Sequence, residues 1–250
     1  MLKQLVKKIL YDYTGIEVIR VPSNKKNLIR IRTDPRYIDV LHEPGFQRSV
    51  ESARAYTMLD TARLANLWQL ARLSNPRGNM LEAGVYRGGA SLHLHNAAPD
   101  RKIFLCDTFE GFRGMKMDDR LDERFRPSPD AKRAACTDTS AEMVRDLLSR
   151  RTRNFQIIEG IFPASDANKD VKALSFVHLD FDLYLSMIET LQYIEPQLIE
   201  RSIIVVDDYL CRAEGAVKAV TEFVASSRNW IVMPVYPGQG VLFHRSWFDA

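Results

Sequence analysis

Four aspartates follow apolar runs that read as strands, and these carboxylates could do chemistry: Asp107, Asp180, Asp207 and Asp208. Ligands of open parallel sheets bind beyond the carboxyl ends of the strands, so we expect the aspartates to share one edge. Crowded carboxylates repel one another, and a divalent cation relieves that repulsion. Mg²⁺ prefers oxygen ligands and keeps some of its waters. The sequence therefore predicts that Asp180, Asp207 and Asp208 hold one Mg²⁺, which would lower the pKa of a bound hydroxyl.

A simpler explanation is that some of these acids cap helices. Asp182 stands where it could cap a helix that starts near Leu185. The adjacent pair Asp207 and Asp208 is harder to explain by capping. His178 lies within the same apolar run that Asp180 ends, and we expect it to be a core histidine with satisfied hydrogen bonds.

A glycine-rich turn is the second feature that could bind a ligand. Residues 82–89 read Glu-Ala-Gly-Val-Tyr-Arg-Gly-Gly, between a short apolar run and a helix expected over 90–98. A strand, a glycine turn and a helix form the first half of a nucleotide-binding βαβ unit. Glycine lets a ligand contact the backbone because no Cβ blocks it. Asp107 lies about 20 residues past Gly84, near the spacing expected of an acid that binds ribose hydroxyls.

The spacing of this turn is not the Gly-x-Gly-x-x-Gly of dinucleotide-binding proteins. A pyrophosphate needs backbone N–H groups at a helix N-terminus, and Glu82 at the start of the turn would repel it. Glu82 suits a ligand with a cationic amine, such as the methionine part of S-adenosylmethionine (SAM). A turn that joins strand and helix without any ligand stays as the alternative.

The elements that must position these residues alternate between strands and helices. Strands are expected to end at 81 and to cover 102–106, 155–159, 174–179, 202–206, 230–235 and 240–244, with helices over 57–73, 90–98, 139–149, 185–199 and 214–226. This order predicts an α/β fold with a mainly parallel seven-stranded sheet and helices on both faces. The pair Pro237-Gly238 predicts a closing antiparallel hairpin. The charged segment 107–129 is either a lid over the site or a plain solvated loop.

The first 50 residues have an irregular pattern. We expect a helix near 2–13 and a strand near 17–21, followed by breaks at Asp34-Pro35 and at Glu43-Pro44-Gly45. The pattern predicts an N-terminal arm over 1–50, which covers the domain or a partner subunit, and one domain over 51–250.

Composition narrows the class of protein. The 250 residues are 46% apolar, enough for a core, and the net charge of +3 comes from mixed charges without a basic stripe. Nucleic acid is therefore not expected as a partner. No apolar stretch approaches the ~18 residues of a membrane span. The three cysteines, Cys106, Cys136 and Cys211, are widely spaced, which favours free thiols in a reducing cytoplasm.

Several segments together resemble the macrocin-type O-methyltransferases, which include macrolide and aminocoumarin sugar methyltransferases. The segments are Thr57-Met58, Arg63-Leu-Ala-Asn66-Leu, the turn 82–89, Asp107-Thr-Phe109-Glu-Gly111, Leu179-Asp180-Phe-Asp182-Leu-Tyr184, Asp207-Asp208-Tyr209, Gly215-Ala-Val-Lys218 and Pro237-Gly-Gln239-Gly240. The resemblance covers roughly residues 55–244. It implies the Rossmann-like fold of class I SAM-dependent methyltransferases and a metal-dependent transfer of methyl to a hydroxyl, typically on a sugar or glycosylated small molecule.

The resemblance also implies roles for single residues. The SAM site would be formed by Glu82, Gly84 and Gly88 at the methionine end, Asp107 at the ribose, Phe109 near the adenosine, and Thr57 and Met58 from the N-terminal side. Asp180, Asp207 and Asp208 would take the metal positions. Because the family often assembles through N-terminal segments, we expect a homo-oligomer formed through the 1–50 arm.

One departure from the family concerns the general base. Macrolide members carry a lid histidine in this role, whereas residues 108–177 contain no histidine. Asp180 or a lid acid would then accept the proton, or coordination to the metal would suffice.

Three other classes of protein stay open. A nicotinamide-dependent oxidoreductase would be expected to have Gly-x-Gly-x-x-Gly after the first strand, a spacing that this sequence lacks. A non-catalytic methyltransferase fold could serve as a partner or assembly module, although the acids are intact. A Mg²⁺-dependent phosphohydrolase would leave the glycine turn unexplained.

Overall fold

The computed structural model describes residues 16–20, 29–33, 39–111, 136–164, 166–180, 183–209 and 214–248. The chain divides into two compact units, residues 1–47 and 48–250. The first unit contains an antiparallel pair, β1 (Ile16–Arg20) and β2 (Ile29–Thr33), and a 3-10 turn, η2 (Asp39–His42). The expected strand near 17–21 corresponds to β1, and the helix expected near 2–13 lies outside the described residues.

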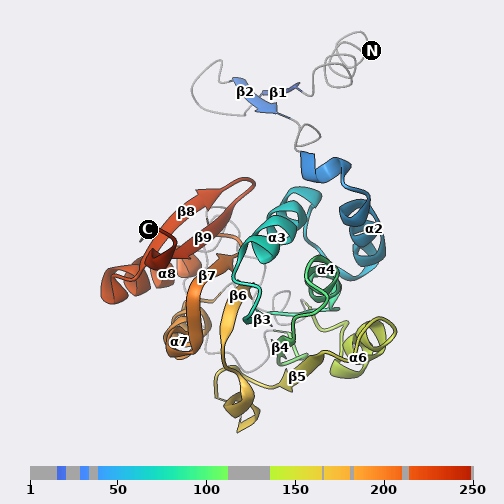
Figure 1. The fold of residues 1–250 in the computed structure, drawn as a ribbon. Coiled ribbons are helices and arrows are strands. Elements are labelled where there is room, and N and C mark those ends of the chain that lie inside the picture. The colour runs from blue at the N-terminus through green and yellow to red at the C-terminus, as the bar shows by residue number, and fades with distance from the viewer. Residues whose placement is uncertain are drawn as a thin grey trace. The chain divides into compact units, whose positions relative to one another are not determined.

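The second unit is built on a seven-stranded sheet with the order β5-β4-β3-β6-β7-β9-β8 (Figure 1). The strands are β3 (Asn79–Ala83), β4 (Ile103–Asp107), β5 (Phe155–Glu159), β6 (Leu174–Leu179), β7 (Leu198–Val206), β8 (Trp230–Val235) and β9 (Gln239–His244). β3 to β7 are mutually parallel, while β9 is antiparallel to both β7 and β8. The predicted sheet and its closing hairpin are therefore confirmed. β3 lies between β4 and β6, where the strand order reverses and such sheets bind ligands.

Helices cover both faces of this sheet, as predicted. The helices are α2 (Pro44–Ala53), α3 (Thr61–Leu73), α4 (Gly89–Ala97), α6 (Ala141–Ser149), α7 (Tyr184–Ile194) and α8 (Glu214–Ser227), with short 3-10 turns η3 (Arg54–Tyr56), η5 (Asp166–Asp170), η6 (Glu195–Gln197) and η7 (Arg245–Trp247). α3 and α4 pack together on one side, and α7 and α8 pack together on the other (Figure 1).

The core shows which strand residues face which layer. Alternate buried residues of the central strands pack with α7 and α8: Leu81, Ala83, Phe104, Cys106, Val177, Leu179, Ile204 and Val206. Successive side chains of a strand point to opposite faces. Glu82 and His178, which are paired neighbours on β3 and β6, therefore point toward the layer of α3 and α4.

Two predicted helix boundaries were wrong, for local reasons. The helix expected from residue 57 begins at Thr61, because Thr57 is extended and the Asp60 side chain caps the helix by accepting from the Arg63 N–H. The helix expected over 185–199 ends at Ile194, because Pro196 has no N–H to continue it. The following strand accordingly starts at Leu198 rather than at residue 202.

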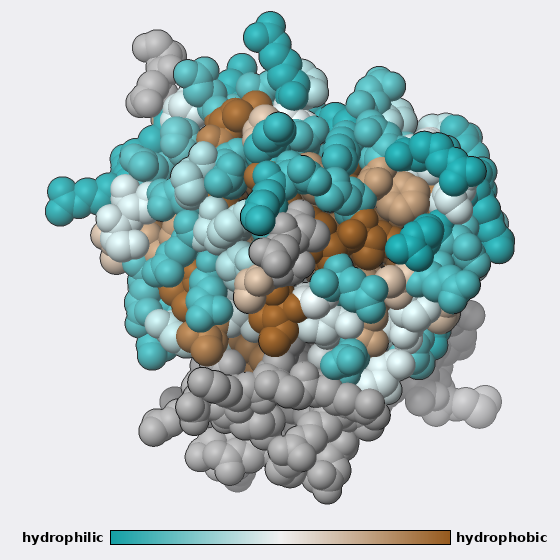
Figure 2. Space-filling model, turned by 90° about the horizontal axis from the view of Figure 1, so that it is seen from below, coloured by the Kyte–Doolittle hydropathy of each residue, from teal (hydrophilic) through white to brown (hydrophobic). Residues whose placement is uncertain are grey.

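The described surface is mainly hydrophilic on the face seen in Figure 2, where hydrophobic residues form separate patches. Among the residues that the structure describes, no helix is long and apolar enough to cross a membrane.

Candidate functional site

A cleft lies at the carboxyl ends of the parallel strands, with an empty volume of about 1070 Å³ that includes space open to solvent. Its lining includes Gly84 and Tyr86 after β3, Asp107 and Thr108 at the end of β4, Gly160, Ile161 and Phe162 after β5, Asp180 and Leu183 after β6, and Asp208 after β7. Met58, Leu59 and Arg63 complete this wall from the side of α3.

The glycine turn forms part of the cleft because its backbone comes very close to β6. Gly84 has φ +87°, and a Cβ built there would lie 2.3 Å from the carbonyl oxygen of Asp180. Gly88 has φ +82° and precedes the first residue of α4. Glycine is therefore required at position 84 by the close approach as well as by the backbone angle.

Asp107 holds the glycine turn against the end of β4. Its Oδ2 accepts hydrogen bonds from the N–H groups of Val85 (2.6 Å) and Tyr86 (2.9 Å), and its Oδ1 accepts from the Phe109 N–H (2.8 Å). Tyr86 and Phe109 have positive φ angles of 53° and 54°. These strained residues frame a carboxylate at the cleft wall, as is common at functional sites.

Glu82 lies behind this turn and is only 1% exposed. The Ser91 hydroxyl of α4 donates to Glu82 Oε2, and His178 Nδ1 lies 3.0 Å from Glu82 Oε1. Glu82 does not line the main cleft but a smaller adjoining cavity, together with Thr57 and Met58. In this structure its carboxylate is bound by protein groups on both oxygens.

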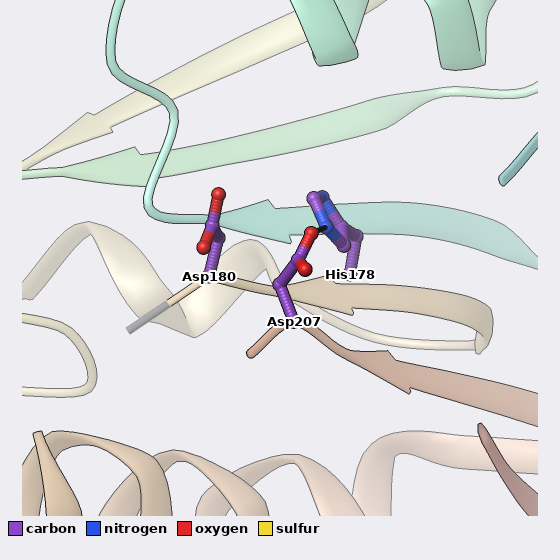
Figure 3. Close-up of side chains that lie close together, drawn as sticks. All are labelled: His178, Asp180 and Asp207. Carbon is purple, nitrogen blue, oxygen red and sulfur yellow. Dashed lines mark ion pairs between the residues drawn. The ribbon is translucent and has the colours of Figure 1, made fainter. Parts of the chain in front are cut away.

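His178 links Glu82 to the acidic end of β7 (Figure 3). Its Nε2 lies 3.5 Å from Asp207 Oδ2, an ion-pair distance. Burial alone would lower the pKa of His178, but the neighbouring Asp207, Glu82 and Asp180 carboxylates outweigh burial and raise that pKa to about 10. The expected core histidine thus lies between two buried carboxylates.

Asp207 is the most heavily bound carboxylate of the site. Its Oδ1 accepts from the Asp208 N–H (2.9 Å), and the Gln239 amide donates to its Oδ2 (3.3 Å). Burial would raise the pKa of Asp207, but His178 and the charge of Arg63 lower it below its ordinary value. Asp207 is therefore a buried carboxylate that stays charged because cations surround it.

Arg63 spans the adjacent acids at the end of β7. Its Nη1 lies 2.8 Å from Asp207 Oδ1, and its Nη2 lies 2.7 Å from Asp208 Oδ1. Asp208 has φ +51°, in the left-handed region. One guanidinium thus pairs with two carboxylates at the position where the sequence predicted a metal ion.

Within the described part of the chain, one group of three side chains could offer ligand atoms to a metal ion within 4.8 Å of one another: His178, Asp180 and Asp207. Figure 3 shows His178 and Asp180 rising from β6 beside Asp207 at the end of β7. The structure thus brings together Asp180 and Asp207 of the predicted set, with His178 as the third member, while Asp208 lies outside the group.

The other predicted residues divide by position. Met58, Gly84, Asp107, Asp180 and Asp208 line the main cleft, and Thr57 and Glu82 line the smaller cavity. Gly88 lies beside Val144 of α6, and Phe109 is buried. Asp182 and the segment 112–135, which contains most of the expected lid, lie outside the described residues.

Arg63 and Asn66 of α3 belong to a segment that resembles the family, but the sequence alone indicated no role for them. Arg63 and Asn66 are three residues apart and so lie on one side of the helix. Asn66 Nδ2 donates to Gln239 Oε1 (2.8 Å) and to the Tyr236 carbonyl (2.7 Å). The available signal was a pair of polar residues at helical spacing among the apolar residues of α3.

The sheet order and the cleft at its carboxyl edge define a Rossmann-like methyltransferase fold. The structure of the O-methyltransferase NovP agrees, with a TM-score of 0.62 and 24% sequence identity over 76% of this chain and 81% of that chain. The sequence pattern of the Macrocin-O-methyltransferase (TylF) family matches residues 7–236. The chain therefore belongs to this family.

Two curated relatives are O-methyltransferases according to their names. Demethyldecarbamoylnovobiocin O-methyltransferase of Streptomyces niveus is 28% identical over 63% of this chain and 64% of its own length. Mycinamicin III 3''-O-methyltransferase of Micromonospora griseorubida is 26% identical over 69% of this chain and 77% of its own length. The match thus spans somewhat less than two thirds of the first relative.

Proposed function

We propose that this chain is a SAM-dependent O-methyltransferase that methylates a hydroxyl of a sugar or a glycosylated small molecule. The observation that carries the proposal is one cleft lined by the glycine turn, by Asp107 and by the acids of β6 and β7. Family membership supports methyl transfer. A further relative, from Streptomyces olivaceus and 25% identical over 62% of this chain, has a rhamnosyl group in the name of its substrate, which supports a glycoside as acceptor.

The residues around the turn fit SAM as cofactor. The backbone at Gly84 and Gly88 would bind the methionine end, and Asp107 would accept from the ribose through lone pairs that its backbone partners leave open. Phe109 would lie at the adenosine, and Met58 would close the cleft from the side of α3. Glu82 and Thr57 border the smaller cavity, where they would meet the amine end.

The acids fit a divalent cation in part. Asp180 and Asp207 offer hard oxygen ligands, which Mg²⁺ prefers, and their ligand atoms are close together. Asp208 would be the third ligand, although Arg63 binds its Oδ1. When bound, Mg²⁺ would act as a Lewis acid toward the acceptor oxygen, and SAM would supply the methyl group.

The chain's own groups would orient the acceptor and handle its proton. Asp180, partly exposed at the cleft wall, would orient the acceptor hydroxyl and accept its proton as general base. The buried walls at Phe162 and Leu183 would exclude water from the reacting groups. His178 would keep Asp207 charged and in place.

The test is methyl transfer from radiolabelled SAM to a panel of glycosides. We expect turnover that EDTA abolishes and Mg²⁺ restores, and we expect Asp207→Asn with Asp208→Asn to lower it at least about a hundredfold. S-adenosylhomocysteine binding by the double variant serves as the control for folding. Turnover that is retained in the variant and indifferent to EDTA would remove the metal from the proposal.

We further propose that the arm over 1–50 mediates homo-oligomer formation and that the domain over 51–250 carries the activity. Light scattering of the full-length protein as it elutes from a size-exclusion column measures its molar mass and therefore its oligomeric state. We also propose a reducing cytoplasmic setting, because the three cysteines are widely spaced in the sequence.

A further inference from the structure

We propose that Arg63 is the resident counter-cation of the acidic edge and competes with the divalent cation for Asp207 and Asp208. The inference rests on the proposed function, because it assumes that these acids take a divalent cation. The side chain of Arg63 would then set the affinity of the site for that cation.

The contacts show why the two cations exclude each other. The two terminal nitrogens of Arg63 bind one oxygen of each carboxylate, at 2.8 Å on Asp207 and 2.7 Å on Asp208. An ion shared by Asp207 and Asp208 would need oxygens from the same two groups. A guanidinium and a divalent ion repel each other, so both cannot occupy this position.

The other partners of Asp207 are fixed in the protein interior. Its Oδ1 also accepts from a backbone N–H, and its Oδ2 faces Gln239 and His178, both of which are fully buried. Arg63 differs, because its side chain is 17% exposed and lines the cleft. Arg63 is therefore the partner that can leave without opening the core.

Asp60 is a second anion that the Arg63 side chain can contact after it leaves Asp207 and Asp208. Asp60, the N-cap of α3, lies 3.7 Å from Arg63 Nε, and its side chain is 55% exposed. Movement of the guanidinium away from β7 would keep this ion pair at the start of the same helix. Asp180 already offers an oxygen beside Asp207, and release of Asp208 would free a further carboxylate at the end of β7.

The test is a Mn²⁺ titration of the full-length protein followed by electron paramagnetic resonance, without SAM or acceptor. Arg63→Met should bind Mn²⁺ about tenfold more tightly than the wild type, because two carboxylates lose their counter-cation. Arg63→Lys should fall between them. Arg72→Met, which removes the same charge from an exposed position of α3, should match the wild type.

Equal or weaker Mn²⁺ binding by a folded Arg63→Met would overturn the inference and leave the proposed function standing. If neither protein binds Mn²⁺ while both bind S-adenosylhomocysteine, the metal assignment fails and this inference fails with it. If Arg63→Met does not fold, a wild-type crystal soaked in Mn²⁺ tests whether Arg63 and the metal ion compete for the acids. The anomalous peak must coincide with loss of the contacts from Arg63, and a bound ion beside an unmoved Arg63 contradicts the competition.

Discussion

At the scale of single residues, the site is defined by two close approaches between segments far apart in the sequence. Gly84 touches the backbone of Asp180, and Arg63 reaches Asp208 across 145 positions of sequence. The first contact joins the proposed cofactor turn to the acidic edge. The second contact, between Arg63 and Asp208, reduces the negative charge of that edge in the ligand-free protein.

The glycine contact can be tested by adding one methyl group. Gly84→Ala should lower the free energy of unfolding by about 2 kcal/mol more than Gly160→Ala, because both positions have positive φ but only Gly84 lacks room for a Cβ. Urea denaturation measures the difference. S-adenosylhomocysteine affinity should fall for Gly84→Ala as well, since the turn must shift. An equal loss of unfolding free energy in the two variants would mean that the backbone near Asp180 shifts to make room for the added methyl group without a cost in stability.

At the scale of elements, α4 is fixed to its neighbours through a buried histidine. His93 Nε2 lies 3.0 Å from the Leu64 carbonyl of α3, and its Nδ1 lies 2.8 Å from the Ser49 hydroxyl of α2. A carbonyl can only accept, so Nε2 carries the proton and Nδ1 accepts from Ser49 in the neutral ring. This arrangement holds the helix that follows the glycine turn.

Neutral His93 should make stability depend on pH. Burial lowers its pKa to about 4, against 6.5 in the unfolded chain. The folded form therefore binds fewer protons between these values, and the free energy of unfolding should fall as pH drops from 6.5 to 4, by roughly 3 kcal/mol from this group. Urea denaturation of the wild type and of His93→Gln across this range isolates the effect, because the carboxylates titrate in both. Parallel curves would show that His93 is protonated in the folded state.

At the scale of the whole molecule, the sequence predicted what depends on local pattern. Apolar runs located the strands, and the helix expected over 139–149 corresponds to α6, which Ser140 caps. Contacts between distant segments could not be predicted from the sequence. Tertiary packing sets both the strand register that pairs Glu82 with His178 and the face of α3 that carries Arg63. The predicted acids therefore lie at one edge as expected, but their partners came only from the structure.

The fold as a whole should respond to its cofactor, and the response separates the classes of protein that the sequence left open. S-adenosylhomocysteine at about 100 times its Kd should stabilise the folded state by about 2.7 kcal/mol. For a protein of this size that corresponds to a rise in Tm of roughly 5–10 °C, measured by calorimetry. NADH should give no rise, because Glu82 and the spacing of the turn disfavour a pyrophosphate. A rise with NADH alone would indicate an oxidoreductase, and no rise with either ligand would indicate a non-catalytic module or a phosphohydrolase.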